Sequence, residues 1–303
     1  MRKVFFVVKD RYWGSALLRG FQISQQLKRY GIPARTLNLS HDLKKVRGIK
    51  DSILFLIKDT IFKSEEFSTS LENNNTVIWD ALDFFVMPAV KREASCRSLK
   101  YPFKRFDGVI FPSLLCQQDW QGLFKADCVT EVIHPHWDTR LKRNRAKNFG
   151  LIYIGMRNEE NIRAQYFEQI KPLHFYDVRQ LRGRFKLEDG LSVILKYNCH
   201  FSVRDENGDA FKYKPGTKLS FASGTCSNII LSREPSHLEL LDRSYPYYTD
   251  NALESVKQTV AMAQETFKTR TWDKALDMML ALRQRTSIKR IADDYMRFLR
   301  NFT

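Results

Sequence analysis

Short apolar runs alternate with amphipathic stretches along the first half of the chain, and this alternation constrains the fold most strongly. The apolar runs predict buried strands over 3–8, 34–38, 52–57, 77–79, 108–111 and 129–133. Apolar residues at helical spacing predict helices between several strands, for instance over 15–30 and 113–124. Gly31 and Pro33 end the first of these patterns. Strands that alternate with helices predict an α/β fold, a parallel sheet with helices on both faces.

The length of the chain predicts two such domains. With 303 residues it is about twice the usual domain size. The stretch 138–149 has no apolar periodicity and carries five basic residues, which is typical of a linker. A second alternating unit follows, with strands expected at 151–154 and 228–231 and a helix at 159–170. We therefore expect a first domain over 1–139, a second over 148–249, and terminal helices over 250–303.

The charge of the chain points to a polyanionic partner. Lys and Arg number 50 and Asp and Glu number 34, so the net charge is 50 − 34 = +16. Nucleotide phosphates, an anionic membrane face and nucleic acid all fit this excess. Hydrophobic residues make up 43%, which excludes a mainly disordered chain.

Neither a targeting signal nor a membrane span is predicted. The apolar run at 4–8 is broken by Lys9 and Asp10, and the run at 53–57 is far below the roughly 20 residues of a span. The five cysteines are scattered without a CxxC pair, which favours reduced thiols and a cytoplasmic location over disulfides or zinc.

Several common signatures are missing from the sequence. It contains no GxGxxG fingerprint, no GxxxxGK[ST] phosphate loop, no HExxH and no GxSxG. Nicotinamide dehydrogenases of the usual kind, Walker NTPases, zincins and α/β-hydrolases are therefore disfavoured. A nucleotide site at the carboxyl ends of the strands stays open.

The segment 212–241 is the most informative part of the sequence. Pro215 and Gly216 predict a turn, Thr217 is expected to cap a short helix, and 229–231 reads as a buried strand. Lys214 and Lys218 flank the start of that helix, where free N–H groups and ammonium charges favour a phosphate. Glu239 is a candidate to bind a ribose. The alternative is a solvated lysine pair on an ordinary β–turn–α unit.

These residues resemble a known family. The order Lys-Pro-x-Thr-Lys-Leu at 214–219, then Ala-x-Gly at 222–224, an apolar strand and a Glu resembles the donor-binding region of GT-B glycosyltransferases, closest to family 4. Looser similarities lie at 13–15, 106–113, 132–138 and 152–155. One departure is that family 4 enzymes carry two glutamates with seven residues between them. If Glu239 is the second, Leu231 occupies the place of the first, and Glu234 is too close to restore the pair.

The resemblance implies two Rossmann-like parallel-sheet domains facing a cleft, with the last helix crossing back to the first domain. It also implies a UDP- or GDP-sugar donor, no bound cofactor, and metal-independent, retaining sugar transfer; no DxD motif is present. Arg, Lys and helix N-termini would then stabilise the leaving diphosphate. The donor-binding candidates are Gly14, Ser15, Arg157, Arg204, Lys214, Thr217, Lys218 and Glu239. A surface salt bridge is the alternative for Arg204.

Two aspartates are the catalytic candidates. Asp80 is expected at the carboxyl end of the 77–79 strand, and Asp83 follows it in the loop. An inverting enzyme would need such a base to accept the proton of the acceptor hydroxyl. In a retaining enzyme the donor phosphate itself can accept that proton. N-capping is the alternative role for Asp80.

A basic stretch over 89–106 suggests the acceptor. It carries one acid and six basic residues with interleaved aromatics; the basic residues are Lys91, Arg92, Arg97, Lys100, Lys104 and Arg105. Such a pattern favours an anionic membrane surface and a lipid-linked or envelope glycan acceptor at the cytoplasmic face. Nucleic acid fits too, either as the acceptor of a phage-type DNA glycosyltransferase or as the ligand of a non-catalytic nucleic-acid- or glycan-binding protein. A merely solvated basic surface is the remaining alternative.

Overall fold

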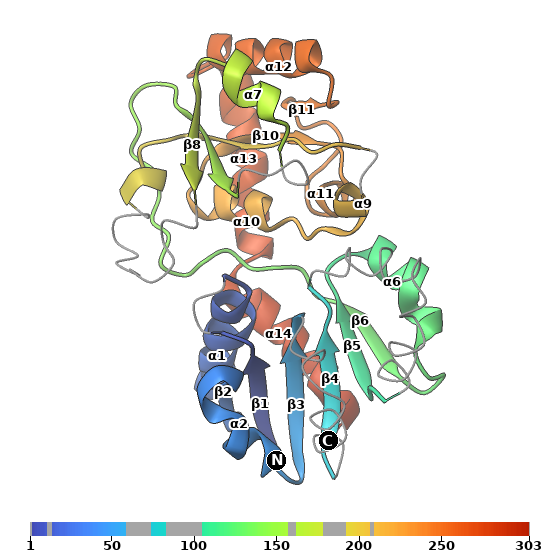
Figure 1. Cartoon of the computed structure of the whole chain (residues 1–303). Helices are drawn as coiled ribbons and strands as arrows, with labels where there is room; N and C mark the ends of the chain where they lie inside the picture. The colour runs from blue at the N-terminus through green and yellow to red at the C-terminus, as the bar shows by residue number, and fades with distance from the viewer. Residues whose placement is uncertain are drawn as a thin grey trace. The chain divides into compact units, whose positions relative to one another are not determined.

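The chain forms two compact units, which are described separately (Figure 1). The computed structural model describes residues 2–10, 14–58, 74–82, 105–156, 162–177, 192–206 and 209–302. The first unit comprises Met1–Pro135, Tyr213–Pro215 and Ile288–Thr303, and the second comprises His136–Lys212 and Gly216–Ser287. Segment 138–149, expected as a linker, belongs to the second unit.

The first unit is built on a six-stranded parallel sheet in the order β2-β1-β3-β4-β5-β6. Its strands are β1 (Lys3–Val8), β2 (Ala34–Asn38), β3 (Ser52–Ile57), β4 (Thr76–Asp80), β5 (Gly108–Phe111) and β6 (Val129–Val132). Four of them agree with the predicted bounds to the residue. The connections change direction between β1 and β3, which makes this point a topological switch of the kind where open sheets bind ligands.

The helices of the first unit begin and end at residues with a clear physical role. The Asn38 side chain accepts a bond from the Ser40 N–H, and the Ser113 side chain caps the Cys116 N–H. Gly31 takes φ +83° just after α1, which only glycine adopts easily. The helices are η1 (Ala16–Gln22, a π-helix), α1 (Ile23–Arg29), α2 (Leu39–Arg47), α6 (Leu114–Trp120), η4 (Gln121–Leu123), α14 (Ile288–Leu299) and η6 (Arg300–Phe302).

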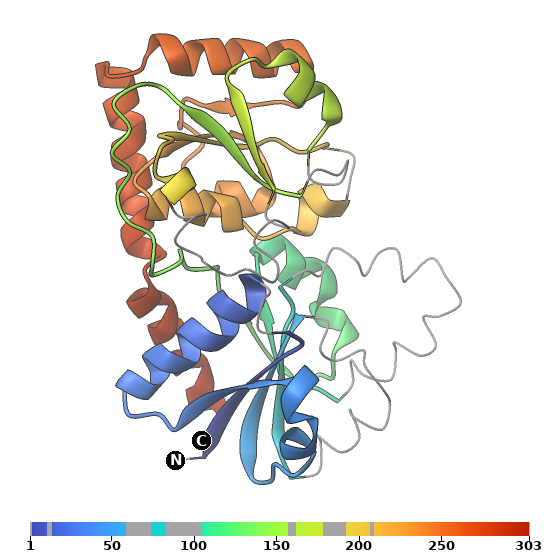
Figure 2. The ribbon, with the colours of Figure 1, turned by 60° about the vertical axis from the view of Figure 1, so that its left-hand side comes forward.

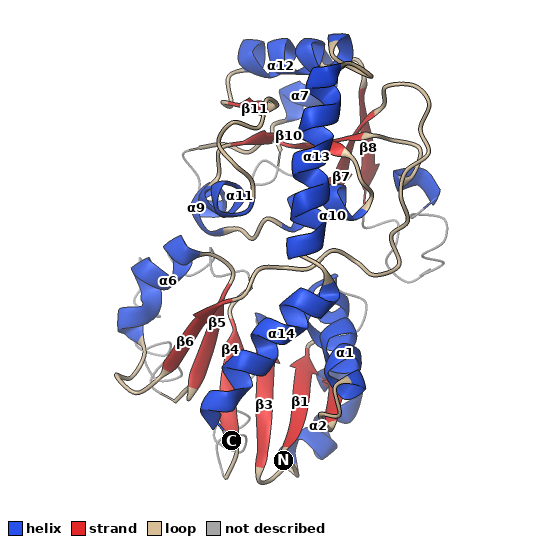
Figure 3. Cartoon of the chain, turned by 180° about the vertical axis from the view of Figure 1, so that it is seen from behind, coloured by secondary structure: helices blue, strands red, loops and turns tan. Residues whose placement is uncertain are grey.

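Both faces of this sheet are covered. Phe6, Phe55 and other residues of one face pack with α1 and α14, whose Tyr295 ring meets Phe6 edge-on. The opposite face packs against α2 and α6 (Figures 2 and 3). Burial on both sides explains why the strands read as continuous apolar runs.

The second unit has a five-stranded parallel sheet in the order β11-β10-β9-β7-β8. Its strands are β7 (Leu151–Gly155), β8 (Leu173–Asp177), β9 (Cys199–Ser202), β10 (Asn228–Ser232) and β11 (Tyr248–Thr249). The order is the same as that of the first five strands of the other sheet, with the switch between β7 and β9. Each unit is thus a Rossmann-like domain.

The helices of the second unit partly follow the predictions. They are α7 (Ala164–Gln169), α9 (Asp209–Tyr213, whose last residue belongs to the first unit), α10 (Thr217–Gly224), α11 (Pro235–Leu240), α12 (Leu253–Glu265) and α13 (Arg270–Arg285). The prediction that Thr217 caps α10 was wrong: the N-cap is Gly216, and Thr217 is already helical. The described part of the helix expected over 159–170 begins only at Ala164, because Ile162 and Arg163 are not helical. Strand β8 and helix α2 were not predicted.

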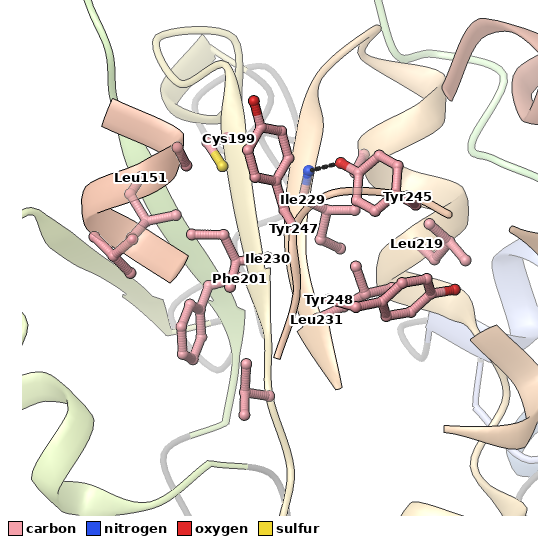
Figure 4. Packing of buried hydrophobic residues seen from close by; sticks show 14 of the residues in the cluster. Leu151, Cys199, Phe201, Leu219, Ile229, Ile230, Leu231, Tyr245, Tyr247 and Tyr248 are labelled. Carbon is pink, nitrogen blue, oxygen red and sulfur yellow. Dashed lines mark hydrogen bonds between the residues drawn. The ribbon is translucent and has the colours of Figure 1, made fainter. Parts of the chain in front are cut away.

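The core of the second unit is rich in tyrosine. The Tyr245 hydroxyl accepts a hydrogen bond from the Ile229 N–H at 2.9 Å and packs edge-on against Tyr247 and Tyr248 (Figure 4). This bond satisfies a hydroxyl that is buried among Leu219 and other apolar side chains. Burial raises the pKa of Tyr245 well above its usual value.

In the described part of the chain, no helix is long and apolar enough to cross a membrane. The four cysteines described, Cys116, Cys128, Cys199 and Cys226, are free thiols. Burial raises the pKa of Cys128 to about 12, so this thiol stays protonated.

Candidate functional site

The carboxyl edge of the second sheet gathers an unusual set of buried polar side chains. The chain leaves β9 at Ser202 and β10 at Ser232, and these two strands are neighbours. Arg204 and Glu234 each follow their strand by two residues. The register pairs Ser202 with Leu231, so Arg204 and Glu234 follow neighbouring strand ends and lie close together at the carboxyl edge of the sheet. This edge is where open α/β sheets hold ligands.

Arg204 and Glu234 form a buried ion pair. The Arg204 side chain is 4% exposed and that of Glu234 is 0% exposed, and one guanidinium Nη contacts the carboxylate directly. The Ser232 hydroxyl donates to the other Glu234 oxygen at 2.8 Å and accepts from the Arg204 backbone N–H at 3.3 Å. The alternative of a surface salt bridge was therefore wrong for Arg204, because neither partner reaches the surface.

His237 completes the cluster from the first turns of α11, which Pro235 opens. Its Nδ1 lies 2.9 Å from the Ser232 carbonyl oxygen, which only accepts, so Nδ1 carries the hydrogen. Burial lowers the pKa of His237, although the nearby charge of Glu234 acts to raise it. The ring is therefore neutral near pH 7. Its Nε2 therefore presents a lone pair, an acceptor rather than a donor.

Four buried polar atoms at this edge have no hydrogen-bond partner within the described structure. They are Ser202 Oγ, Arg204 Nε, His237 Nε2 and Thr249 Oγ1, the last from the final residue of β11. Buried polar groups are normally paired, because an unmet donor or acceptor costs about 1–3 kcal/mol. These atoms come from the carboxyl ends of β9 and β11 and from α11, and their concentration indicates a place prepared for polar atoms of a ligand or of water.

The N-terminus of α10 adds positive charge to the same unit. Lys218 stands in its first turn, and the Lys218 Nζ lies 4.1 Å from the centre of the Tyr153 ring, on β7. The Tyr153 hydroxyl donates to the Met156 carbonyl at 3.0 Å just past that strand, and burial raises its pKa. A Cβ at Gly216 would lie 3.1 Å from Leu240 Cδ1, so the start of α10 packs closely on α11.

The remaining donor candidates are placed differently. Lys214 lies in Tyr213–Pro215, which belongs to the first unit, where the Tyr213 hydroxyl donates to Asp119 at 2.9 Å. Glu239 is half-buried on α11, while Glu234 is the glutamate of the buried cluster. Gly14 and Ser15 precede η1 in the first unit. Arg157 lies outside the described residues.

Asp80 occupies a second buried charge cluster, in the first unit. Arg19 binds it with two hydrogen bonds, Nε to Oδ2 at 2.8 Å and Nη2 to Oδ1 at 3.0 Å, and both side chains are 0% exposed. The Tyr295 hydroxyl donates to Oδ2 at 2.7 Å. The alternative N-cap role was wrong, because Asp80 ends strand β4 inside this cluster. This geometry favours a structural role; catalysis by Asp80 stays a prediction, and Asp83 lies outside the described residues.

Of the predicted basic surface only Arg105 is described. It is half-buried next to the buried Phe106. The other five, Lys91, Arg92, Arg97, Lys100 and Lys104, lie outside the described residues. No group of three or more His, Cys, Asp or Glu side chains suited to a metal ion occurs in the described ranges.

Sequence reasoning missed Glu234 and His237 as site residues, and Arg19 and Tyr295 as partners of Asp80. The available signal for Glu234 was its position directly after a buried strand and before a helix-opening proline. The tautomer of His237 could not be predicted from the sequence, because it depends on the contact of Nδ1 with the Ser232 carbonyl oxygen.

Comparisons with known proteins add structural relatives only. No protein-family model matches the chain. No curated protein matches it by sequence either. Among solved structures, Anabaena HepE with UDP and glucose aligns over 100% of both chains, with a TM-score of 0.68 and 11% identity. Sucrose-phosphate synthase from Thermosynechococcus elongatus aligns over 99% of both, with a TM-score of 0.66 and 9% identity.

A third neighbour, the glycosyltransferase AviGT4 of avilamycin A biosynthesis, aligns over 99% of this chain and 98% of its own, with a TM-score of 0.62 and 11% identity. At these identities the likeness concerns the fold. These neighbours are GT-B glycosyltransferases, and both units here are Rossmann-like parallel-sheet domains with strand order 2-1-3-4-5. The chain has the GT-B fold.

Proposed function

We propose that this protein is a glycosyltransferase that binds a nucleoside diphosphate sugar at the carboxyl edge of its second sheet. The observation that carries the proposal is the group of unpartnered buried polar atoms on Ser202, Arg204 and His237. The fold neighbour HepE, which was solved with UDP and with UDP-glucose, supports a ligand of this chemical class.

Cleavage of such a donor leaves a diphosphate whose developing charge must be stabilised. Lys218 and the N-terminus of α10 supply positive potential without a metal ion. Glu234 holds Arg204 through an Nη atom, which leaves Nε as a fixed donor. Because Glu234 also compensates part of the guanidinium charge, we expect Lys218 to contribute more to diphosphate binding than Arg204.

His237 suits a hydroxyl rather than a phosphate. Its neutral ring offers the Nε2 lone pair, which would repel an anionic oxygen but accept a hydrogen bond from a sugar hydroxyl. Arg204 Nε provides a donor in the same cluster. We propose that Arg204 Nε and His237 Nε2 together bind one hydroxyl of the sugar nucleotide. We propose that the half-buried Glu239 binds the ribose.

The finer features of the reaction follow the resemblance of 214–224 to family 4. We propose metal-independent transfer from a UDP- or GDP-sugar with retention of configuration. The donor phosphate would then accept the acceptor proton, which fits an Asp80 whose two oxygens are held by Arg19 and Tyr295. Gly14, Ser15, Arg157, Lys214 and Thr217 stay proposed donor contacts.

For the acceptor we propose a lipid-linked or envelope glycan at the cytoplasmic face of a membrane. The net charge of +16 supports an anionic setting. The same charge supports the second candidate, a DNA-modifying glycosyltransferase or a non-catalytic nucleic-acid-binding protein on this fold.

A nucleotide panel tests the donor site. Thermal unfolding is measured with UDP, GDP, ADP and CMP on wild type, on Lys218→Ala and on Lys212→Ala, an exposed lysine of α9 as matched control. A ligand at 100 times its Kd adds about 2.7 kcal/mol and raises Tm. We expect UDP or GDP to raise the Tm of wild type and of Lys212→Ala, and the shift to be lost in Lys218→Ala.

Absence of a shift with every nucleotide would contradict the donor site. Tight, strongly salt-dependent binding of nucleic acid in that case would favour the non-catalytic alternative. An equal loss of the shift in both lysine variants would mean that general charge, rather than the start of α10, attracts the nucleotide.

A further inference from the structure

A basic strap crosses the opposite edge of the second sheet. This strap, residues 138–150, leads into β7, and hydrogen bonds and packing hold it along its length. The Leu141 side chain is buried, and the Asn144 side chain donates to Thr225 O, Cys226 O and Ser227 Oγ at 3.1, 2.8 and 3.0 Å. Its backbone N–H donates to Thr225 O at 2.8 Å.

Asn198 holds the far end of the strap. Its amide donates to the Asn148 carbonyl at 2.9 Å and accepts from the Gly150 N–H at 3.1 Å. Thr225–Ser227 lead into β10, Asn198 leads into β9, and Gly150 leads into β7. The strap therefore crosses the amino ends of three adjacent strands, while Arg204 and Glu234 follow the carboxyl ends of two of them.

The strap displays a row of exposed cations. Lys142, Arg143, Arg145 and Lys147 are all exposed, and Lys196 is exposed beside Gly150. The sequence from 139 to 158 contains no acidic residue. Within the described structure no ion pair engages any of these five side chains. Four of the five lie on one anchored backbone, so little conformational entropy is lost when an anionic surface binds them.

No exposed large apolar side chain lies beside these cations, because Leu141 is buried and Phe149 is partly buried against Phe267 and Trp272. The exposed large hydrophobics among the described residues are elsewhere, on Phe21, Tyr30, Leu43, Leu114, Met156 and Phe175. Base stacking on aromatics, on which single-stranded nucleic acid relies, is therefore not available on the strap. No helix is present there to enter a DNA groove either, since 138–150 contains no helix or strand. Charge attraction, without stacking or groove insertion, is the mode of binding that the strap offers.

We propose that the strap and Lys196 form a docking surface for the anionic headgroups of a lipid bilayer. Polybasic segments are attracted to such membranes through charge alone, without insertion. Contact at the amino edge leaves the carboxyl edge of the same sheet accessible to a small ligand. The proposal goes beyond the proposed transfer activity and does not depend on it.

Vesicle cosedimentation tests this surface at about 0.1 M salt. The vesicles are phosphatidylcholine alone or with phosphatidylserine added. The strap variant carries Gln at positions 142, 143, 145 and 147. The control variant carries Gln in place of four exposed basic residues of the first unit, Lys28, Arg35, Lys44 and Arg47. Both variants have the net charge 16 − 4 = +12. An unchanged Tm verifies that the variants are folded.

We expect wild type and the control variant to bind the phosphatidylserine vesicles and not pure phosphatidylcholine. The strap variant should bind several-hundred-fold more weakly, because each basic residue near the surface contributes about a factor of five. Equal binding by the two variants would overturn the proposal, since net charge alone would then suffice. Strap-dependent binding of duplex DNA without vesicle binding would overturn it in favour of nucleic acid. Because neither readout uses a nucleotide sugar, a failure here is distinct from a failure of the donor site.

Discussion

His200 shows what burial does to a single titratable residue. It lies on β9 with 3% of its surface exposed, and its Nε2 is 3.3 Å from Thr225 Oγ1. Burial lowers its pKa to about 4, so the ring is neutral near pH 7. It is a core histidine of the second unit rather than a catalytic group.

This residue gives the protein a predictable acid sensitivity. An unfolded histidine has a pKa near 6.5. Between pH 6.5 and 4, His200 is therefore protonated in the unfolded chain but neutral in the native chain. Stability is therefore lost as the pH falls through this window. Protonation of His200 alone should lower the free energy of unfolding by about 2 kcal/mol between pH 7 and 5. The pKa of His237 is also lowered, so His237 changes the stability in the same direction.

Urea unfolding at pH 7 and pH 5 checks this prediction. The loss of unfolding free energy between the two pH values should be smaller in His200→Gln than in wild type. The same loss in both proteins would show that His200 is not responsible for it.

At the scale of elements, a polar contact within an apolar interface fastens α14 to the first sheet. Tyr295 of α14 donates to Asp80 at the end of β4, and Arg19 of η1 holds the same carboxylate. Phe298 packs so closely on Gly108 that a Cβ there would lie 2.9 Å from its ring. The Asp80 carboxylate thus joins two helices to the carboxyl end of a strand.

Removing this carboxylate should destabilise the first unit strongly. Asp80→Asn leaves the buried Arg19 without a countercharge, which typically costs about 3–5 kcal/mol. Tyr295→Phe removes only one hydrogen bond and should cost about 1 kcal/mol. Denaturant unfolding of both variants measures the difference. A folded Asp80→Asn of unchanged stability that no longer transfers sugar would instead assign Asp80 as the base.

The elements that sequence predicted best are those buried on both faces. Strand β3, SILFLI, is buried at every residue and reads as one apolar run. Strand β8, LHFYD, has two exposed residues and a weaker pattern, so it was missed. Helix α2 escaped detection because only Leu39 and Val46 are buried along its nine residues.

The candidate site was predictable only in part, for a similar reason. Lys218 and Arg204 follow local signals, a helix start and a strand end. The partnership of Arg204 with Glu234 spans 30 residues and depends on the register between β9 and β10. No local pattern encodes that register.

At the scale of the whole molecule, two units with the same strand order carry different chemistry. In the first, the buried acid at the carboxyl edge is fully engaged by Arg19 and Tyr295. In the second, the same edge keeps unpartnered atoms on Arg204 and His237. The second unit also separates its two proposed surfaces, with the basic strap at the amino edge and the donor site at the carboxyl edge.

The most direct test of the central claim is hydrogen–deuterium exchange with and without the nucleoside diphosphate that raises Tm. We expect slower exchange at the start of α10 and in the segment that joins β10 to α11, with the strap unchanged. Protection that appears elsewhere while these two segments stay unprotected would contradict a nucleotide-sugar site at the carboxyl edge of the second sheet.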